Sequence, residues 1–229
     1  KEIKAIFSLG TPIALSLLFE VSLFAIVAII LVPFGAQVIA SHQVALNFTS
    51  LVFMVPLSIA MATTIKVGFA IGNNNLKQAR DYTRYSIILG LLLACLTAFI
   101  TVVFREQIAG IYSTELPVIE LAASLMLLAA VYQFSDTIQV VSAGALRGYK
   151  DTKSILYITF VSYWLVGLTV GLILGITDWI VPSMGAYGFW IGFIVGLTTA
   201  AVLLAWRLSV IQKRLQQSIS LPNEVNSVN

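Results

Sequence analysis

Long apolar segments separated by short polar stretches dominate the pattern of this chain. A helix that crosses a bilayer needs about 20 consecutive, mostly apolar residues. Six stretches reach that length, and they cover residues 6–32, 42–65, 82–104, 116–142, 155–176 and 185–206. The pattern predicts an all-α integral membrane protein, with a six-transmembrane-helix bundle in residues 1–207 and a polar cytoplasmic tail in residues 208–229.

The composition agrees with a membrane protein. Hydrophobic residues make up 59% of the chain, charged residues only 10%, and the mean hydropathy is +0.97, whereas soluble domains usually carry about 25% charged residues. A signal peptide does not explain the first segment, because five more spans follow and no small-residue cleavage site is suitably placed. The chain begins at Lys1 rather than at a methionine, so we expect a fragment or a processed product.

Basic residues indicate the orientation in the membrane. Cytoplasmic loops of membrane proteins are enriched in Lys and Arg. With six spans, twelve of the 13 basic residues fall on one side and only Arg105 falls on the other. We therefore expect both ends of the chain in the cytoplasm. The positive net charge does not indicate nucleic-acid binding, since no basic patch is interleaved with aromatic residues.

Two carboxylates lie near the middle of predicted spans, Glu20 in the first and Asp136 in the fourth. A charged side chain at the bilayer centre costs about 2.5–3.5 kcal/mol on insertion scales, so an intramembrane acid indicates a functional site. Neither span contains a basic residue that would pair with its acid. Each acid taken alone is also compatible with a protonated, hydrogen-bonded carboxyl that helps helices pack. Two acids at similar depth favour a cation site.

Other polar residues accompany the two acids. Tyr132, Asp136 and Gln139 follow at spacings of four and three residues, which places them on one helical face. Hard oxygen ligands of this kind suit Na⁺ or a proton better than a soft metal. We predict cation binding by Glu20, Tyr132 and Asp136, with monovalent cations only. Possible cavity-lining residues are Ser16, Gln43, Asn47, Ser135 and Gln139.

Proline and glycine mark two further features of the spans. Pro56 lies inside the second span and is expected to kink that helix, either as a bending point or as a tolerated structural irregularity. Glycines recur every four residues in the last two spans, a pattern that lets helix backbones approach closely. They are Gly167, Gly171 and Gly175 in the fifth span, and Gly188, Gly192 and Gly196 in the sixth.

The residues do not indicate an enzyme. Only one Asp lies within a span, whereas presenilin-like aspartyl proteases need two, and no HExxH zinc motif occurs. The lone His42 stands at a helix entrance, where we expect it to cap or to pack. The single cysteine, Cys95, lies inside the third span, so neither a disulfide framework nor a cysteine metal site is indicated. We expect no cofactor other than Na⁺ or H⁺ as a coupling ion.

Four stretches resemble one family of membrane transporters. They read FSLGTPIALSLLFEVSLFAIVAII, HQVALNFTSLVFMVPLSIAMATTIKVG, LLAAVYQFSDTIQVVSAGALRGYKDTKS and GFWIGFIVGLTTAA. The chain thereby resembles the C-terminal six helices of MATE (multidrug and toxic compound extrusion) transporters of the bacterial NorM-like branch. In that family an acid in the seventh helix and a Tyr and an Asp in the tenth form a cation site, and these positions match Glu20, Tyr132 and Asp136.

The resemblance implies one lobe of a twelve-helix antiporter in a bacterial inner membrane. Such an antiporter exports cationic, amphipathic drugs in exchange for Na⁺ or H⁺. Its expected partners are the lipid bilayer, cationic small molecules and a missing N-terminal six-helix lobe, supplied by the same longer protein or by a partner chain; no nucleic acid is expected. Two alternatives remain open: a flippase or exporter of a lipid-linked substrate from the same superfamily, and a structural or inactive membrane half.

Overall fold

Helices joined by short connections form the protein across residues 2–225, the part that this computed structural model describes. They are α1 (Glu2–Ile30), η1 (Val32–Phe34), α2 (Ala36–Gly72), α3 (Leu76–Tyr112), α4 (Leu116–Gly148), α5 (Thr152–Phe160), η2 (Val161–Gly167), α6 (Leu168–Ile176) and α7 (Ala186–Val225). Six segments of this part are long and apolar enough to cross a bilayer, and α5, η2 and α6 together form the fifth. The predicted all-α class with six membrane-crossing helices is confirmed.

The helices extend beyond the apolar spans. α3 begins at Leu76, well before the span expected from residue 82, because the Asn75 side chain accepts a hydrogen bond from the Gln78 N–H at 3.0 Å and caps the helix. α7 continues to Val225, so the predicted tail is helical over residues 208–225. Good helix formers such as Lys, Arg, Leu and Gln fill the first part of that extension. Lys1 and residues 226–229 lie outside the described residues.

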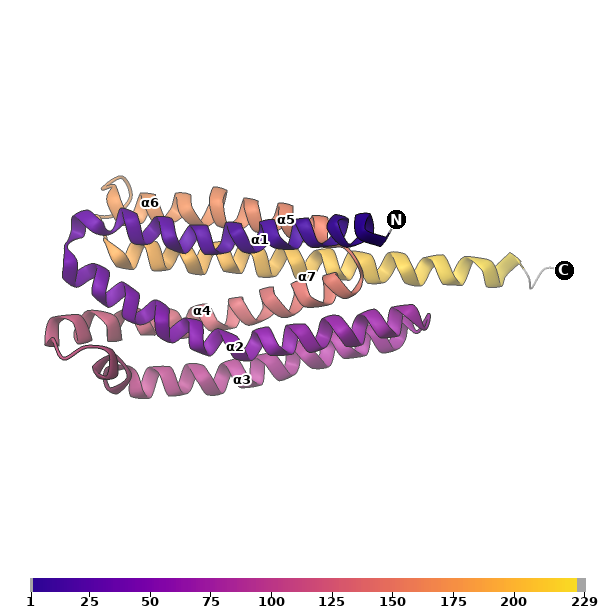
Figure 1. Ribbon diagram of the computed structural model, residues 1–229, viewed down its shortest axis with the longest axis horizontal. Coiled ribbons are helices and arrows are strands. Elements are labelled where there is room, and N and C mark those ends of the chain that lie inside the picture. The colour runs from indigo at the N-terminus through magenta and orange to yellow at the C-terminus, as the bar shows by residue number, and fades with distance from the viewer. Residues whose placement is uncertain (1, 226–229) are drawn as a thin grey trace.

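The helices form two groups (Figure 1). One group contains α2, α3 and α4, and the other contains α1, α7 and the span built from α5, η2 and α6. Contacts between α4 and α7 join the two groups. α2 changes direction part-way along its length (Figure 1), and Pro56 lies inside it, as expected for a proline kink.

α1 is attached mainly to one of these groups. It packs on α5 and η2 and makes little contact with α2. The ring of Phe19 lies 5.0 Å from that of Phe160, and the indole Nε1 of Trp164 donates to the Phe19 carbonyl at 3.2 Å. These contacts fix α1 beside η2 and leave space between α1 and α2.

Glycines bring the backbones of η2, α6 and α7 into close contact. A Cβ added at Gly192 would lie 2.6 Å from the carbonyl oxygen of Gly167, and one added at Gly196 would lie 3.0 Å from the Gly167 Cα. α2 and α4 meet in the same way, since a Cβ at Gly144 would lie 2.5 Å from the Ala60 carbonyl oxygen. The close packing predicted from the glycine spacing in the last two spans is confirmed.

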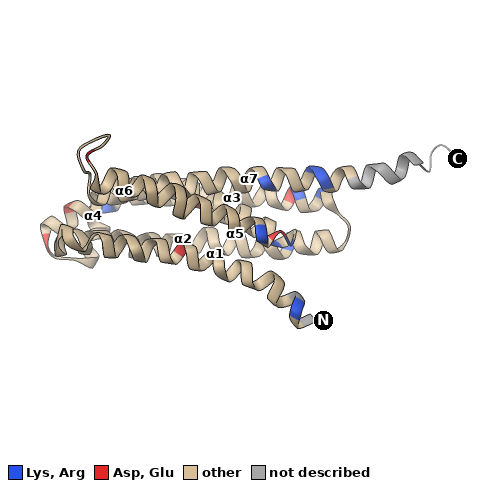
Figure 2. Ribbon diagram, turned by 90° about the horizontal axis from the view of Figure 1, so that it is seen from above, with Lys and Arg blue, Asp and Glu red and all other residues tan. Residues whose placement is uncertain are grey.

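The two chain ends lie at the same end of the bundle (Figure 1), and most of the Lys and Arg residues lie towards that end (Figure 2). This end, called the basic end below, carries the α2–α3 and α4–α5 connections. At this end an ion pair connects α7 to the α4–α5 connection, with Arg207 Nε 2.7 Å from Asp151 Oδ2. Ser154 donates to the other oxygen of the same carboxylate at 2.8 Å. The α4–α5 turn is thereby tied to α7.

We expect Gly192→Ala to destabilise the bundle by about 1–3 kcal/mol, because the added methyl group has no room between α7 and η2. The free energy of unfolding in mixed detergent micelles measures the effect. Gly10→Ala is the matched control, since nothing lies within 4 Å of a Cβ at Gly10. Equal stabilities of the two variants would contradict the close backbone contact.

Candidate functional site

A partly open cavity of about 310 Å³ lies between α1 and α2, and Glu20 of α1 lines it. Gln43 and Asn47 of α2 also line it, and Gln43 Nε2 donates to Asn47 Oδ1 at 3.3 Å. The remaining lining residues are mostly apolar: Leu17, Val21, Phe24, Leu46, Thr49, Ser50, Phe53 and Tyr132. The cavity therefore presents one acid and two amides on an otherwise largely apolar surface.

Asp136 lies in a second and much smaller pocket, of about 10 Å³, between α2, α3 and α4. Its side chain is only 3% exposed, and Oδ1 has no hydrogen-bond partner among the described residues. A buried carboxylate without a partner carries a large desolvation cost when it is ionised. The pocket has room for about one water-sized sphere, so a water or a small cation fits the space beside Asp136.

Tyr132 connects the two cavities. Its side chain lines both, as do those of Thr49 and Phe53 on α2. The carboxylates of Glu20 and Asp136 lie close enough to interact electrostatically, and both also interact with Tyr132. The tertiary structure thus brings the three residues predicted to bind a cation into one region, with Tyr132 common to the two cavities.

Pro56 adds a backbone feature to the Asp136 pocket. Proline has no N–H, so it cannot donate to the carbonyl of Val52, four residues earlier in α2. Val52 and Pro56 both line the pocket of Asp136. The kink therefore leaves a helix carbonyl without its usual donor beside a buried acid.

Three residues predicted to line a cavity are placed differently and line neither of these two. Ser16 is buried, and its hydroxyl donates to the Ile13 carbonyl of its own helix at 2.8 Å. Ser135 shares a 2.8 Å hydrogen bond with Thr198 and joins α4 to α7. Gln139 is 4% exposed, and its Oε1 has no partner within residues 2–225.

Gln133 is a pocket residue that the sequence analysis missed. It lines the Asp136 pocket from α4 and accepts a 2.7 Å hydrogen bond from Thr97. It also donates to Thr101 at 3.0 Å, so it links α4 to two successive turns of α3. A polar residue next to Tyr132 was visible in the sequence, but its two partners lie on another helix.

Tyr163 is a second such residue. It lies in the π-helical segment η2, is 2% exposed, and its hydroxyl has no hydrogen-bond partner in the described part of the chain. The Tyr163 side chain lies within electrostatic range of Glu20 and Asp136. π-helical segments inside α-helices often occur at functional sites. The polar pair Ser162 and Tyr163 within an apolar span was the available signal.

Arg147 supplies a positive charge that the sequence analysis did not connect with the acids. It lies in the last turn of α4, its Nε is buried without a hydrogen-bond partner among residues 2–225, and it interacts electrostatically with Glu20. In the sequence, Arg147 is one of the twelve basic residues whose distribution indicates the orientation. In the structure Arg147 is partly buried in the last turn of α4, the helix that also carries Asp136.

His42 packs in the core. It is fully buried, and its Nδ1 accepts a hydrogen bond from Trp190 Nε1 at 3.2 Å. The Trp190 ring in turn lies 6.3 Å from that of Tyr132. His42 therefore supports the wall behind Tyr132, which fits the packing role expected for it.

The arrangement offers carboxylate, phenol, hydroxyl and carbonyl oxygens around two acids. Among the side chains that the structure describes, there is no group of three or more His, Cys, Asp or Glu residues that could hold a metal ion. Oxygen ligands of this kind suit a hard cation or a proton better than a soft metal.

Sequence comparison identifies relatives of this chain. The model of the MatE family matches residues 12–173. The chain is 57% identical over 213 residues to the multidrug resistance protein NorM of Aliivibrio fischeri, an alignment that covers 93% of this chain and 46% of that protein. It is 55% identical over 211 residues to the multidrug resistance protein MdtK of Yersinia enterocolitica, covering 92% and 46% respectively. The chain thus spans about half the length of these relatives.

Solved structures share the fold. The eukaryotic MATE transporter AtDTX14 superposes with a TM-score of 0.84 at 23% identity, covering 93% of this chain and 48% of that structure. A MATE protein in a bent conformation superposes with a TM-score of 0.86 at 19% identity, covering 94% and 47%. At these identities the likeness concerns the fold alone.

We expect Tyr163→Phe to raise the free energy of unfolding by about 1 kcal/mol, because it removes a buried hydroxyl that has no partner. Unfolding in mixed micelles without added Na⁺ measures the effect. Tyr157→Phe is the control, since Tyr157 lies on the same span and is 68% exposed. A clear loss of stability in Tyr163→Phe alone would mean that the hydroxyl is hydrogen-bonded.

Proposed function

The chain belongs to the MatE family, and from this premise we propose that it is one lobe of a cation-coupled multidrug antiporter. In this proposal the protein exports cationic, amphipathic drugs in exchange for Na⁺ or H⁺. Glu20, Tyr132 and Asp136 hold the coupling cation. The proposal rests on the chemistry of these residues and on the names of the relatives, which are multidrug resistance proteins.

The environment of Asp136 favours a bound cation. The carboxylate is buried, one of its oxygens has no partner in the described part of the chain, and the adjoining pocket has room for about one small particle. A bare carboxylate there carries a desolvation cost that a bound cation offsets. The nearby charge of Glu20 adds repulsion, which further favours cation uptake.

Cation and substrate movement are coupled because the negative charges of the two acids must be neutralised at every stage. With a cation bound beside Asp136, the charge of that acid is neutralised. When the cation leaves, water, a helix rearrangement or a cationic substrate must take its place. Arg147 interacts with Glu20 and so supplies part of the balance from within the protein. Competition between the cation and a cationic substrate for the same negative charge then gives antiport.

The larger cavity suits an amphipathic cation as substrate. Leu17, Phe24 and Phe53 provide apolar surface, while Glu20 provides a negative charge at the same site. Its volume of about 310 Å³ lies at the small end of ligand pockets. A drug-sized molecule therefore needs additional surface, which a second lobe facing the space between α1 and α2 would supply.

A second six-helix lobe completes the proposed transporter. The relatives are about twice as long as this chain, and alternating access in such transporters is largely a rocking of one bundle against another around a midplane site. The second lobe comes from the same longer protein or from a partner chain. We further propose a bacterial inner membrane, with the basic end in the cytoplasm, because cytoplasmic loops are enriched in Lys and Arg.

We expect Asp136→Asn and Glu20→Gln each to lower the apparent affinity for the coupling cation in drug efflux by about 10- to 100-fold. This range corresponds to the loss of one charged ligand, or about 1.5–3 kcal/mol. Efflux of a fluorescent cation from vesicles that contain the full-length protein measures the effect, driven by an imposed Na⁺ or H⁺ gradient. The two gradients tested separately identify the coupling ion.

Glu120→Gln is the matched control, because Glu120 is exposed and lies on the same helix as Asp136. It should leave efflux unchanged. Wild-type coupling in both Asp136→Asn and Glu20→Gln would contradict the cation site. Absence of drug efflux in the wild-type protein, together with movement of a lipid-linked substrate, would favour a flippase instead.

A further inference from the structure

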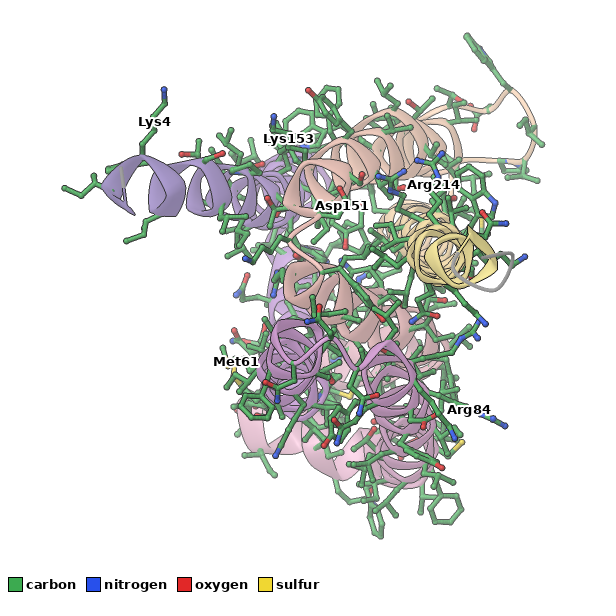
Figure 3. The ribbon with its side chains drawn as sticks, turned by 90° about the vertical axis from the view of Figure 1, so that its right-hand side faces the viewer. Lys4, Met61, Arg84, Asp151, Lys153 and Arg214 are labelled. Carbon is green, nitrogen blue, oxygen red and sulfur yellow. The ribbon has the colours of Figure 1, made fainter. Side chains whose placement is uncertain are left out.

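A third cavity, of about 640 Å³, lies at the basic end and far from Asp136. The α2–α3 connection and the start of α3 form one side, and the extension of α7 beyond the apolar span forms the other. Figure 3 looks onto this end of the bundle, with the C-terminal part of α7 and the connection between α2 and α3 towards the viewer. The part of α7 beyond residue 206, where the predicted span ends, supplies Gln212, Leu215 and Gln216 to the lining.

The charge of this cavity is positive. Lys77 and Arg80 line it, and none of its lining residues is acidic. Asp81 follows Arg80 in the chain but does not line the cavity, and Asp151 is engaged by Arg207 and Ser154. The two basic side chains therefore face the cavity without a carboxylate that would neutralise them there.

Neutral hydrogen-bonding groups complete the lining. Residues 73–75 are three asparagines, and Gln212 and Gln216 face them from α7. Arg80 reaches Gln216 only through a long hydrogen bond of 3.5 Å, which leaves most of its five N–H donors for other groups. Amide and guanidinium N–H groups are donors that suit the oxygens of a phosphate.

Tyr149 forms the base of this lining and adds no negative charge. Its hydroxyl accepts a hydrogen bond from Gln212 Nε2 at 3.3 Å. Burial raises the pKa of the Tyr149 phenol above its usual range, an effect that the Gln212 hydrogen bond and the charge of Arg80 partly offset. The phenol thus stays neutral at physiological pH.

The position of the cavity favours a lipid as the source of the phosphate. About one helical turn away, α2 and α3 expose large apolar or aromatic side chains, with Phe69 67% and Tyr85 66% exposed. Acyl chains would cover such surfaces while a headgroup occupies the polar cavity. Basic pockets between transmembrane helices on the cytoplasmic side are sites at which anionic headgroups bind.

We propose that this cavity, lined by Lys77, Arg80, Tyr149 and the amides around them, binds the phosphate headgroup of an anionic phospholipid. The bound lipid would hold the α7 extension against the α2–α3 connection. This site is separate from the acids of the proposed transport site, so the two proposals stand or fall independently.

Native mass spectrometry of the full-length protein in detergent tests the proposal, with phosphatidylglycerol and phosphatidylcholine titrated separately. We expect tighter binding of phosphatidylglycerol. The double variant K77Q/R80Q should bind it about 25-fold more weakly, at about fivefold for each lost charge. The matched control K4Q/K153Q removes two exposed charges that do not line the cavity, and it should bind as the wild-type protein does.

Two further arms complete the design. Inorganic phosphate replaces the lipid in one, and phosphate binding as tight as that of phosphatidylglycerol would overturn the lipid assignment. Equal binding of both lipids, or an equal loss in K77Q/R80Q and K4Q/K153Q, would overturn the site. The thermal unfolding midpoint of each variant without lipid checks folding, and the single variants K77Q and R80Q serve if the double variant is unstable.

Discussion

The absence of water from a bilayer core governs this structure. Every backbone group must find its partner inside the span, which leaves helices as the available element for a chain of this composition. Hydroxyl side chains obey the same requirement by bonding to their own helices, as Thr49 does to Ala45 and Thr63 does to Ile59. A buried polar atom without a partner therefore lowers the stability of the fold, because its desolvation is not compensated by a hydrogen bond.

Unpaired buried oxygens occur on Asp136 itself and on Tyr163, which lies within electrostatic range of both acids. Asp136 and Gln139 on α4, and Ser162 and Tyr163 on η2, each have a buried polar atom without a partner in the described residues. Such groups are not needed for the stability of the bundle, because apolar residues of similar volume would pack equally well in their place. The unpaired oxygens of Asp136 and Tyr163 are consistent with the cation site proposed above.

Close packing and open space alternate in the bundle for identifiable reasons. Glycines allow α7 to rest against η2 and α6, and α2 against α4, at backbone distance. α1 instead attaches through Phe19 to Phe160 and Trp164, which leaves it apart from α2. The cavity at Glu20 therefore follows from how α1 is anchored. A kinked α2, with Pro56 beside Asp136, shapes the wall between the two acids.

The sequence by itself determined the class of the protein, the number of spans and the placement of Glu20, Tyr132 and Asp136 in apolar segments. It could do so because hydrophobic length and helical spacing are local properties of the chain. Only the tertiary structure decided which polar residues meet. Tyr163 and Arg147 come near the acids from distant segments, while Ser16 and Ser135 bond elsewhere. The rotation of each helix about its axis depends on packing against its neighbours, and no pattern within a single span specifies it.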